Sequence, residues 1–77
     1  MHQPPSDHPA QTATQKLLVE VWRQIFALEF VGIHDDFFEL GGDSLNVIEA
    51  VLAAHLRGLT ISPDMLVAHS TIYDLSQ

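Results

Sequence analysis

The sequence contains no cysteine. No disulfide can therefore staple the chain, and no thiol of its own is available for chemistry. Basic residues are also scarce, because Lys16, Arg23 and Arg57 stand against ten acidic residues, for a formal net charge of −7. Such an acidic chain has little to attract the phosphates of nucleic acids or an anionic membrane surface. We therefore expect no nucleic-acid partner and no membrane partner, and we favour proteins with basic surfaces as partners.

Long apolar runs are missing as well. No stretch approaches the roughly 20 apolar residues that a membrane-spanning helix requires, and the amino terminus lacks the basic and then apolar pattern of a secretory signal. A cytoplasmic protein is the expectation. With 77 residues the chain allows one domain. A chain of this size buries only about 60% of its unfolded surface, so helices with short local contacts are the expected source of stability.

Residues 1–13 contain three prolines and little apolar bulk, which predicts a flexible leader or linker. The domain itself is expected over residues 14–77. Its first helix is predicted to begin at a capping box formed by Thr12 and Gln15. An apolar stripe at helical spacing follows. The stripe comprises Leu17, Leu18, Val21, Trp22, Ile25, Phe26 and Leu28.

Residues 29–43 form a long connection that is too apolar to lie free in water. Its large apolar residues are Phe30, Val31, Ile33, Phe37, Phe38 and Leu40. The connection is therefore predicted to pack on the helices as a structured loop, a feature that is often functional. Within it, Asp35 is predicted to cap a short helical turn. His34, Asp35 and Asp36 are adjacent and do not easily converge on one ion, so no metal site is expected.

A second helix is predicted from Ser44 to about Arg57, with Asp43 as its N-cap and Gly58 as its stop. Ser44 then lies in the first turn, where backbone N–H groups lack intrahelical partners and favour an anionic group. The glycines at 41–42 permit positive φ and leave no side chain in the path of an approaching enzyme. This pattern predicts that Ser44 is covalently modified.

The second helix is apolar on two opposite sides. One side comprises Val47, Ala50, Val51 and Ala54, and the other comprises Leu45, Ile48, Leu52 and Leu56. One side must be core, and the other is either a second core contact or an exposed docking patch. Periodicity alone leaves this choice open.

Two short helices are predicted after the second helix. Ser62, with Pro63 at the first helical position, starts a third helix of little more than one turn that includes Met65. A last helix begins at residue 70 or 71, with Ile72 and Leu75 facing inward.

The segment Phe37–Leu45, preceded by His34-Asp35-Asp36 and followed by Thr71–Leu75, resembles the carrier domains of nonribosomal peptide synthetases. These are peptidyl carrier proteins, the thiolation domains of the acyl-carrier-protein superfamily. The resemblance runs from about residue 16 to residue 77. It implies an all-α four-helix bundle with a long structured loop between helices 1 and 2 and a short third helix.

The resemblance also implies the chemistry. Ser44 would receive a 4′-phosphopantetheine arm from coenzyme A through a magnesium-dependent phosphopantetheinyl transferase, with Gly42, Asp43 and Leu45 around the attachment point. The thiol of the arm would hold aminoacyl or peptidyl groups as thioesters in an antibiotic or siderophore pathway. An adenylation or ligase enzyme would load it, and condensation, tailoring or thioesterase domains would act on the cargo. The chain itself would be a non-catalytic, monomeric carrier.

Partner docking is implied for residues beside the serine and along the second and third helices. These are Leu45, Asn46, Ile48, Glu49, Leu52 and Met65. Between Glu29 and Glu49 there are six acidic residues and no basic one. Such a rim would steer basic enzyme surfaces toward the serine, although an ordinary solvated face would have the same composition.

The sequence departs from the family pattern in the second helix and before the fourth. Ala50 and Ala54 stand where the family has larger aliphatic residues, so either the helix is rotated or large residues elsewhere fill the space. The candidates for filling it are Trp22, Phe26 and Phe30. Ser70 replaces the usual proline before Thr71, and the third-helix sequence is not the commonest one.

Three other functions compete with a peptidyl carrier. An acyl carrier of a polyketide or fatty-acid system shares the Asp-Ser-Leu core, and the paired glycines favour the peptidyl type over it. Gly42–Leu45 is also the signature of the lipases and esterases named after those four letters, whose serine is a nucleophile. That family needs a larger α/β domain and an Asp-x-x-His near its end, which this chain lacks. A helical docking module without modification is the third.

Overall fold

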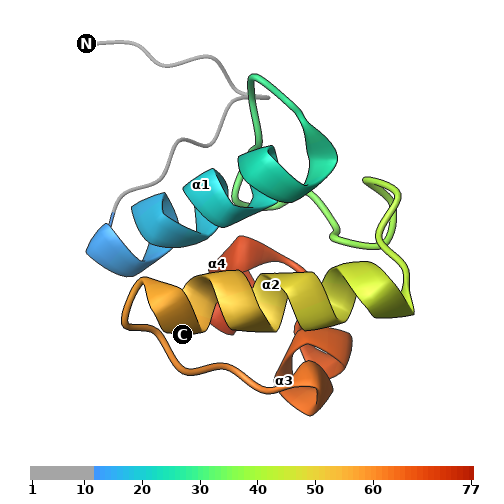
Figure 1. Ribbon diagram of the computed structural model, residues 1–77. Helices are drawn as coiled ribbons and strands as arrows, with labels where there is room; N and C mark the ends of the chain where they lie inside the picture. Colours follow the sequence, from blue (N-terminus) through green and yellow to red (C-terminus); the bar gives the residue numbers. More distant parts are fainter. Residues whose placement is uncertain (1–11) are drawn as a thin grey trace, which may run out of the picture.

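The computed structural model of the chain describes residues 12–77, which form four helices and no strand. The helices are α1 (Ala13–Phe26), α2 (Ser44–Leu56), α3 (Pro63–Ala68) and α4 (Ile72–Leu75). Helix α1 packs on α2 and α4, and α3 packs on α2 (Figure 1). The prediction of an all-α four-helix bundle with a short third helix is therefore confirmed. Residues 1–11 of the predicted leader lie outside the described residues.

Helix α1 begins where the sequence predicts. The Thr12 hydroxyl accepts a hydrogen bond from the backbone N–H of Gln15 at 3.0 Å, which satisfies one of the free donors of the first turn. The Gln15 amide is buried, and its Nε2 donates to the Ser76 hydroxyl at 3.3 Å. The start of α1 is thus tied to the last residues of the chain.

Helix α1 ends earlier than the apolar stripe suggests. Ala27 adopts the left-handed conformation, with φ of 54°, and its N–H bonds to the carbonyl of Arg23. The chain leaves the helix there, so Leu28 lies outside α1 and is exposed. The prediction that Leu28 belongs to the helical stripe is wrong, because the left-handed cap turns this residue away from the core.

Two aromatic rings form the centre of the core. Trp22 and Phe37 are both fully buried, and their rings meet edge to face with centroids 5.0 Å apart. Ala50 and Ala54 of α2 are fully buried in the same core. The small side chains of Ala50 and Ala54 therefore share the core with large aromatic side chains from α1 and from the loop. Phe30 does not take part, because 86% of it is exposed, so the prediction that Phe30 fills this space is wrong.

The connection between α1 and α2 is a structured loop, as predicted. Val31, Ile33 and Phe37 are its buried anchors. Two backbone bonds attach it to the α4 region: Phe37 N–H donates to the carbonyl of Ser70 at 2.8 Å, and Tyr73 N–H donates to the carbonyl of Ile33 at 2.9 Å. The loop is held against the bundle along its length, although Phe30 points into solvent.

The two last helices begin at the predicted caps. The Ser62 hydroxyl accepts from the N–H of Met65 at 3.2 Å, and the Thr71 hydroxyl accepts from the N–H of Asp74 at 3.1 Å. Helix α4 buries Ile72. Within residues 12–77, none of the helices has the length and apolar character that crossing a bilayer requires.

Candidate functional site

Ser44 is the first residue of α2 and is exposed to solvent. Asp43 precedes it as the N-cap, and the Asp43 carboxylate accepts from the N–H of Asn46 at 3.0 Å. The Asn46 side chain accepts in return from the N–H of Asp43 at 3.1 Å. The cap at Asp43 was predicted, whereas the return bond was not. The signal for it was a side-chain acceptor three residues after the cap, the spacing of a capping box.

The cap leaves two backbone donors available beside the serine. Asp43 occupies the N–H of Asn46 through its carboxylate and the N–H of Val47 through its carbonyl, at 3.0 Å each. Within the part of the chain that the structure describes, no acceptor bonds the N–H of Ser44 or Leu45. Free donors at the positive end of a helix dipole suit a phosphate group. The residues present therefore fit a phosphodiester on the Ser44 hydroxyl.

The two glycines before the cap have different roles. Gly41 has a φ of 110°, and no atom lies within 4 Å of the position that a Cβ would take. Of the two glycines that permit a positive φ, Gly41 adopts one and Gly42 does not. At Gly42 a Cβ would lie 2.4 Å from the ring of Phe37. Gly42 is thus required by a close approach, a contact that sequence reasoning missed.

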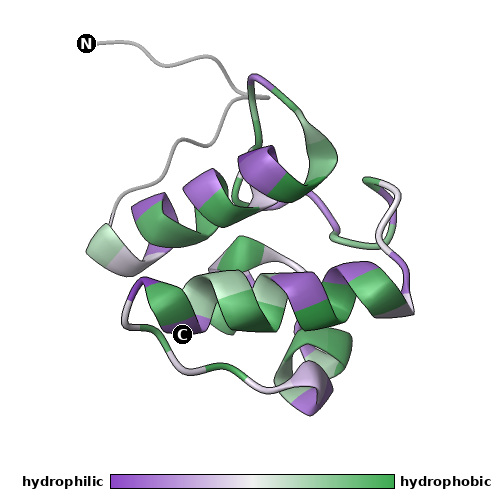
Figure 2. Cartoon of the chain, in the orientation of Figure 1, coloured by the Kyte–Doolittle hydropathy of each residue, from purple (hydrophilic) through white to green (hydrophobic). Residues whose placement is uncertain are grey.

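The structure decides which side of α2 is core. Val47, Ala50 and Ala54 are buried. The opposite side is exposed by half or more at every large position and forms an outward apolar face, comprising Leu45, Ile48, Leu52 and Leu56. Most of the α2 ribbon is coloured as hydrophobic, with a few hydrophilic segments between (Figure 2). The helix is therefore not rotated relative to the family pattern. The second apolar side of α2 is an exposed patch and not a second core contact.

The predicted docking residues lie on this outward side or on the adjoining α3. Ile48 and Leu52 are exposed on α2, and Met65 of α3 is 40% exposed. Asn46 is half-buried, and its Nδ2 donates to the Glu49 carboxylate at 3.0 Å, which fixes both side chains beside the cap. The exposure of Ile48, Leu52 and Met65 is compatible with docking, and the docking role of all these residues stays a prediction.

Asp36, and not Asp35, caps the turn that precedes the glycines. The Oδ2 of Asp36 accepts from the N–H of Phe38 at 2.9 Å and of Glu39 at 3.1 Å. The prediction for Asp35 is wrong, because its carboxylate instead accepts from the N–H of Gly32 at 2.8 Å. Both residues are acidic and adjacent, so only the path of the loop could decide between them.

The other carboxylate oxygen of Asp36 accepts a hydrogen bond from the Ser70 hydroxyl. This bond lowers the pKa of the Asp36 carboxyl below its usual range, aided by the N–H groups of Glu39 and Phe38, while partial burial acts in the opposite direction. Three acids of the predicted rim, Asp35, Asp36 and Asp43, therefore bind backbone N–H groups. They shape the loop as well as contribute charge.

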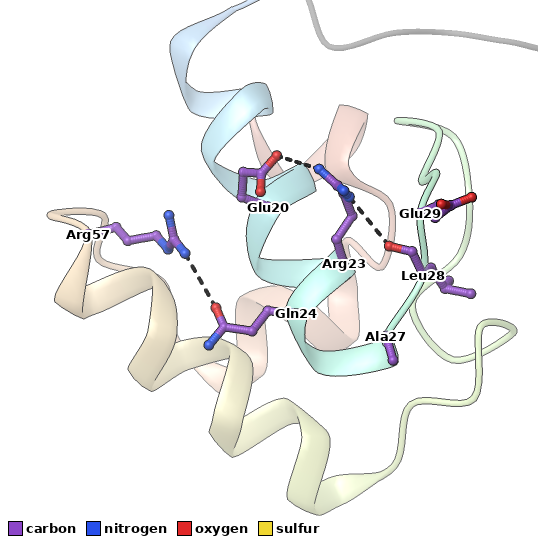
Figure 3. A pocket seen from close by; sticks show the side chains of 7 residues that line it. All are labelled: Glu20, Arg23, Gln24, Ala27, Leu28, Glu29 and Arg57. Atoms are coloured by element: carbon purple, nitrogen blue, oxygen red, sulfur yellow. Dashed lines mark hydrogen bonds and ion pairs between the residues drawn. The ribbon is translucent and has the colours of Figure 1, made fainter.

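A shallow groove of about 410 Å³ lies apart from Ser44, between the end of α1 and Arg57 (Figure 3). Both of its arginines are engaged with neighbouring polar groups. Arg23 pairs with Glu20 at 2.9 Å, and Arg57 donates to the Gln24 side chain at 3.3 Å. None of its lining residues belongs to the segment around Ser44. The groove is therefore not part of the candidate site.

Comparison with protein families gives one match over most of the chain. The model of a family described as a phosphopantetheine attachment site matches residues 16–77. The chain is 44% identical over 66 residues to one of the proteins of the linear gramicidin synthase of Brevibacillus parabrevis. That match covers 86% of this chain and 1% of the length of the synthase protein. The chain thus corresponds to a small part of this relative.

Three of the solved structures with the same fold are described as a PCP, as a peptidyl carrier protein or as a protein that includes a PCP. A "Non Ribosomal PCP domain" superposes with a TM-score of 0.86 at 32% identity, over 90% of each chain. A peptidyl carrier protein described in complex with the phosphopantetheine transferase Sfp and coenzyme A gives a TM-score of 0.82 at 28% identity, over 92% of each chain. The McyG A-PCP protein with phenylalanyl-adenylate gives 0.74 at 28% identity, over 86% of this chain and 10% of that one.

Proposed function

We propose a role for Ser44 from the premise that the chain belongs to the phosphopantetheine attachment site family: its hydroxyl carries the 4′-phosphopantetheine arm. The observation that supports this most is the position of Ser44, an exposed hydroxyl at a capped helix start beside two free N–H donors. The arm supplies a thiol that holds acyl groups as thioesters, in a chain that has no cysteine.

The attachment forms one bond and breaks one. The Ser44 oxygen bonds to the phosphorus that bears pantetheine in coenzyme A, the pyrophosphate P–O bond breaks, and 3′-phospho-AMP leaves. The transferase takes up the hydroxyl proton. Asp43 holds the helix start in place through its capping box with Asn46. The N–H groups of Ser44 and Leu45 then face the new phosphodiester and stabilise its charge.

The chain serves as a peptidyl carrier domain of the nonribosomal type, and itself performs no catalysis. Its partners are a phosphopantetheinyl transferase, an adenylation or ligase enzyme, and condensation, tailoring or thioesterase domains. The descriptions of the Sfp complex and of the A-PCP protein support the first two of these. The domain is predicted at residues 14–77 and the leader at 1–13, but Thr12 and Ala13 belong to the start of α1. A cytoplasmic location stays a prediction.

Docking uses the part of the outward apolar face of α2 that lies nearest to Ser44, comprising Leu45, Ile48 and Leu52, together with Met65 of α3. Burial of exposed apolar side chains on association supplies the favourable free energy. The acids around the site, among them Glu39 and Glu49, add an attraction for basic surfaces. The cargo is chosen by the enzyme that loads the arm.

Intact-mass measurement tests the attachment. The chain is incubated with coenzyme A, Mg²⁺ and a broad-specificity phosphopantetheinyl transferase. We expect a gain of one phosphopantetheine in the wild type and none in Ser44→Ala. Ser76→Ala is the matched control and should gain the same mass as the wild type. A folded wild type that gains nothing, or a Ser44→Ala variant that gains the mass, would overturn the proposal.

A second measurement separates the peptidyl from the acyl type. The modified chain is offered an adenylation enzyme with ATP and an amino acid, or an acyltransferase with malonyl coenzyme A. We expect aminoacyl thioester on the arm in the first case only. Loading by the acyltransferase alone would favour a polyketide or fatty-acid carrier. An esterase is not supported, because residues 12–77 contain no strand to place a nucleophilic serine.

A further inference from the structure

Gly42 touches Phe37 in two ways. Its N–H donates to the Phe37 carbonyl at 3.1 Å. Its Cα faces the Phe37 ring so closely that a Cβ would lie 2.4 Å from Cε2, 2.5 Å from Cδ2 and 2.8 Å from the carbonyl oxygen. These distances are too short for any side chain to be tolerated without movement. The loop backbone therefore rests directly on the Phe37 ring, two residues before Ser44.

Phe37 is in turn fixed by the core. The side chain is fully buried, and the rings of Trp22 and Phe26 of α1 meet it edge to face, each with a centroid distance of 5.0 Å. Its N–H donates to the carbonyl of Ser70, just before α4. Close-packed rings in a core have little room to shift. Phe37 thus connects Gly42 to α1 and to Ser70, so the packing of these elements determines where Gly42 lies.

The other residues of the attachment segment, residues 41–44, are exposed to solvent and do not pack in the core. A Cβ at Gly41 would have no atom within 4 Å, although the Gly41 N–H donates to the Phe38 carbonyl at 3.2 Å. We propose that Phe37 and Gly42 are positioning residues for the modification of Ser44: their contact sets the distance of the serine from the core and so presents it to the transferase. This inference rests on the proposed attachment at Ser44, and it adds a reason why position 42 must be glycine.

Gly42→Ala is the direct test. The added methyl group has to displace the loop, because the buried ring cannot yield, and a displaced nucleophile reacts more slowly. We expect the kcat/KM for modification to fall about tenfold or more. The matched control is Val21→Ala, which removes packing from a fully buried site on α1 and changes no residue of the loop. It should lower the Tm by a comparable amount and be modified at the wild-type rate.

A double variant tests whether the two residues act together. Phe37→Leu removes the ring atoms nearest to Gly42, so adding Gly42→Ala to it should reduce kcat/KM by less than in the wild type. Should Gly42→Ala alone not fold, Phe37→Leu is compared with Val21→Ala and should be modified more slowly at a similar Tm.

Amide NMR shifts of the unmodified chain give a readout independent of the reaction. In Gly42→Ala the shifts of residues 43–45 should move, while those of α3 stay. Equal kcat/KM losses in Gly42→Ala and Val21→Ala, fully additive losses in the double variant, or unmoved shifts at 43–45 would overturn the inference. A wild type that is not modified would instead overturn the proposed function.

Discussion

The hydroxyl of Ser70 donates a hydrogen bond to the carboxylate of Asp36, 34 residues earlier in the chain. The two segments also form a single antiparallel bridge between Asp36 and Thr71. The bond joins the loop after α1 to the start of α4. Proline, the usual residue of the family at position 70, has no side-chain donor for such a bond. Serine in place of proline at position 70 therefore provides the hydrogen bond to Asp36.

The Asp36–Ser70 bond predicts a pH dependence of stability. The pKa of Asp36 in the folded chain is lowered, first by the Ser70 hydroxyl and then by two backbone N–H groups. The stabilisation is therefore complete above the unfolded pKa of about 3.9 and is lost as the pH falls through the lower, folded pKa. Thermal unfolding of the wild type and of Asp36→Asn should show a Tm gap at neutral pH that closes on acidification. When both proteins also carry Ser70→Ala, the Tm difference caused by Asp36→Asn at neutral pH should be smaller. A Tm difference between wild type and Asp36→Asn that does not change with pH would contradict the prediction.

The capping box of α2 predicts the cost of removing Asp43. Asp43→Ala leaves the N–H of Asn46 without its acceptor and breaks the reciprocal pair of bonds that closes the box. We expect the free energy of unfolding to fall by about 1 kcal/mol, measured by urea denaturation. Asp43→Asn keeps a side-chain acceptor and is the matched control, with a much smaller loss. Equal losses in both variants would show that the cap is not the cause.

The outward face of α2 predicts a separation of docking from folding. Ile48 is half exposed, so Ile48→Asp should keep the helical circular dichroism signal. Loading by the cognate adenylation enzyme should fall about tenfold or more, because a charge enters an apolar contact. Leu56→Asp is the control on the same face, about 18 Å further along the helix from Ser44, and should load nearly normally. Loss of helical signal in Ile48→Asp would mean that Ile48 is core.

The different burial of Phe30 and Phe37 predicts a small effect on stability when the first ring is removed and a large loss when the second is removed. Phe30 is 86% exposed and Phe37 is fully buried. Phe30→Ser should change the free energy of unfolding by less than about 0.5 kcal/mol. Phe37→Ala should cost about 3 kcal/mol or more, because it opens a cavity in the core. Chemical denaturation monitored by circular dichroism measures both, and comparable losses would contradict the placement of these rings.

The helix starts could be predicted from sequence because they depend on local chemistry. Thr12, Asp43, Ser62 and Thr71 each accept a hydrogen bond from an N–H three residues later. A side-chain oxygen followed by a helical pattern is enough to identify such a cap. The place of Ser44 at the start of α2, and hence the core of the candidate site, followed from the same local rule.

The contacts between distant segments could not be predicted in that way. Nothing local distinguishes Phe30 from Phe37, or Asp35 from Asp36, because each pair differs only in where the loop meets the helices. The role of Gly42 depends on a ring five residues earlier that α1 holds in place. The exposed side of α2 likewise follows from the burial of its other side against the core. These features belong to tertiary packing, which residue spacing does not encode.

The edge-to-face contact of Trp22 with Phe37 gives the molecule an optical reporter. Trp22 is the single tryptophan of the sequence, and its indole N–H is buried with no hydrogen-bond partner among residues 12–77. An indole shielded from water emits at shorter wavelength than a hydrated one. Since the ring that Trp22 touches also supports Gly42, loosening of the loop around Ser44 should shift this emission to longer wavelength. The state of the attachment segment can thus be followed by fluorescence without any label.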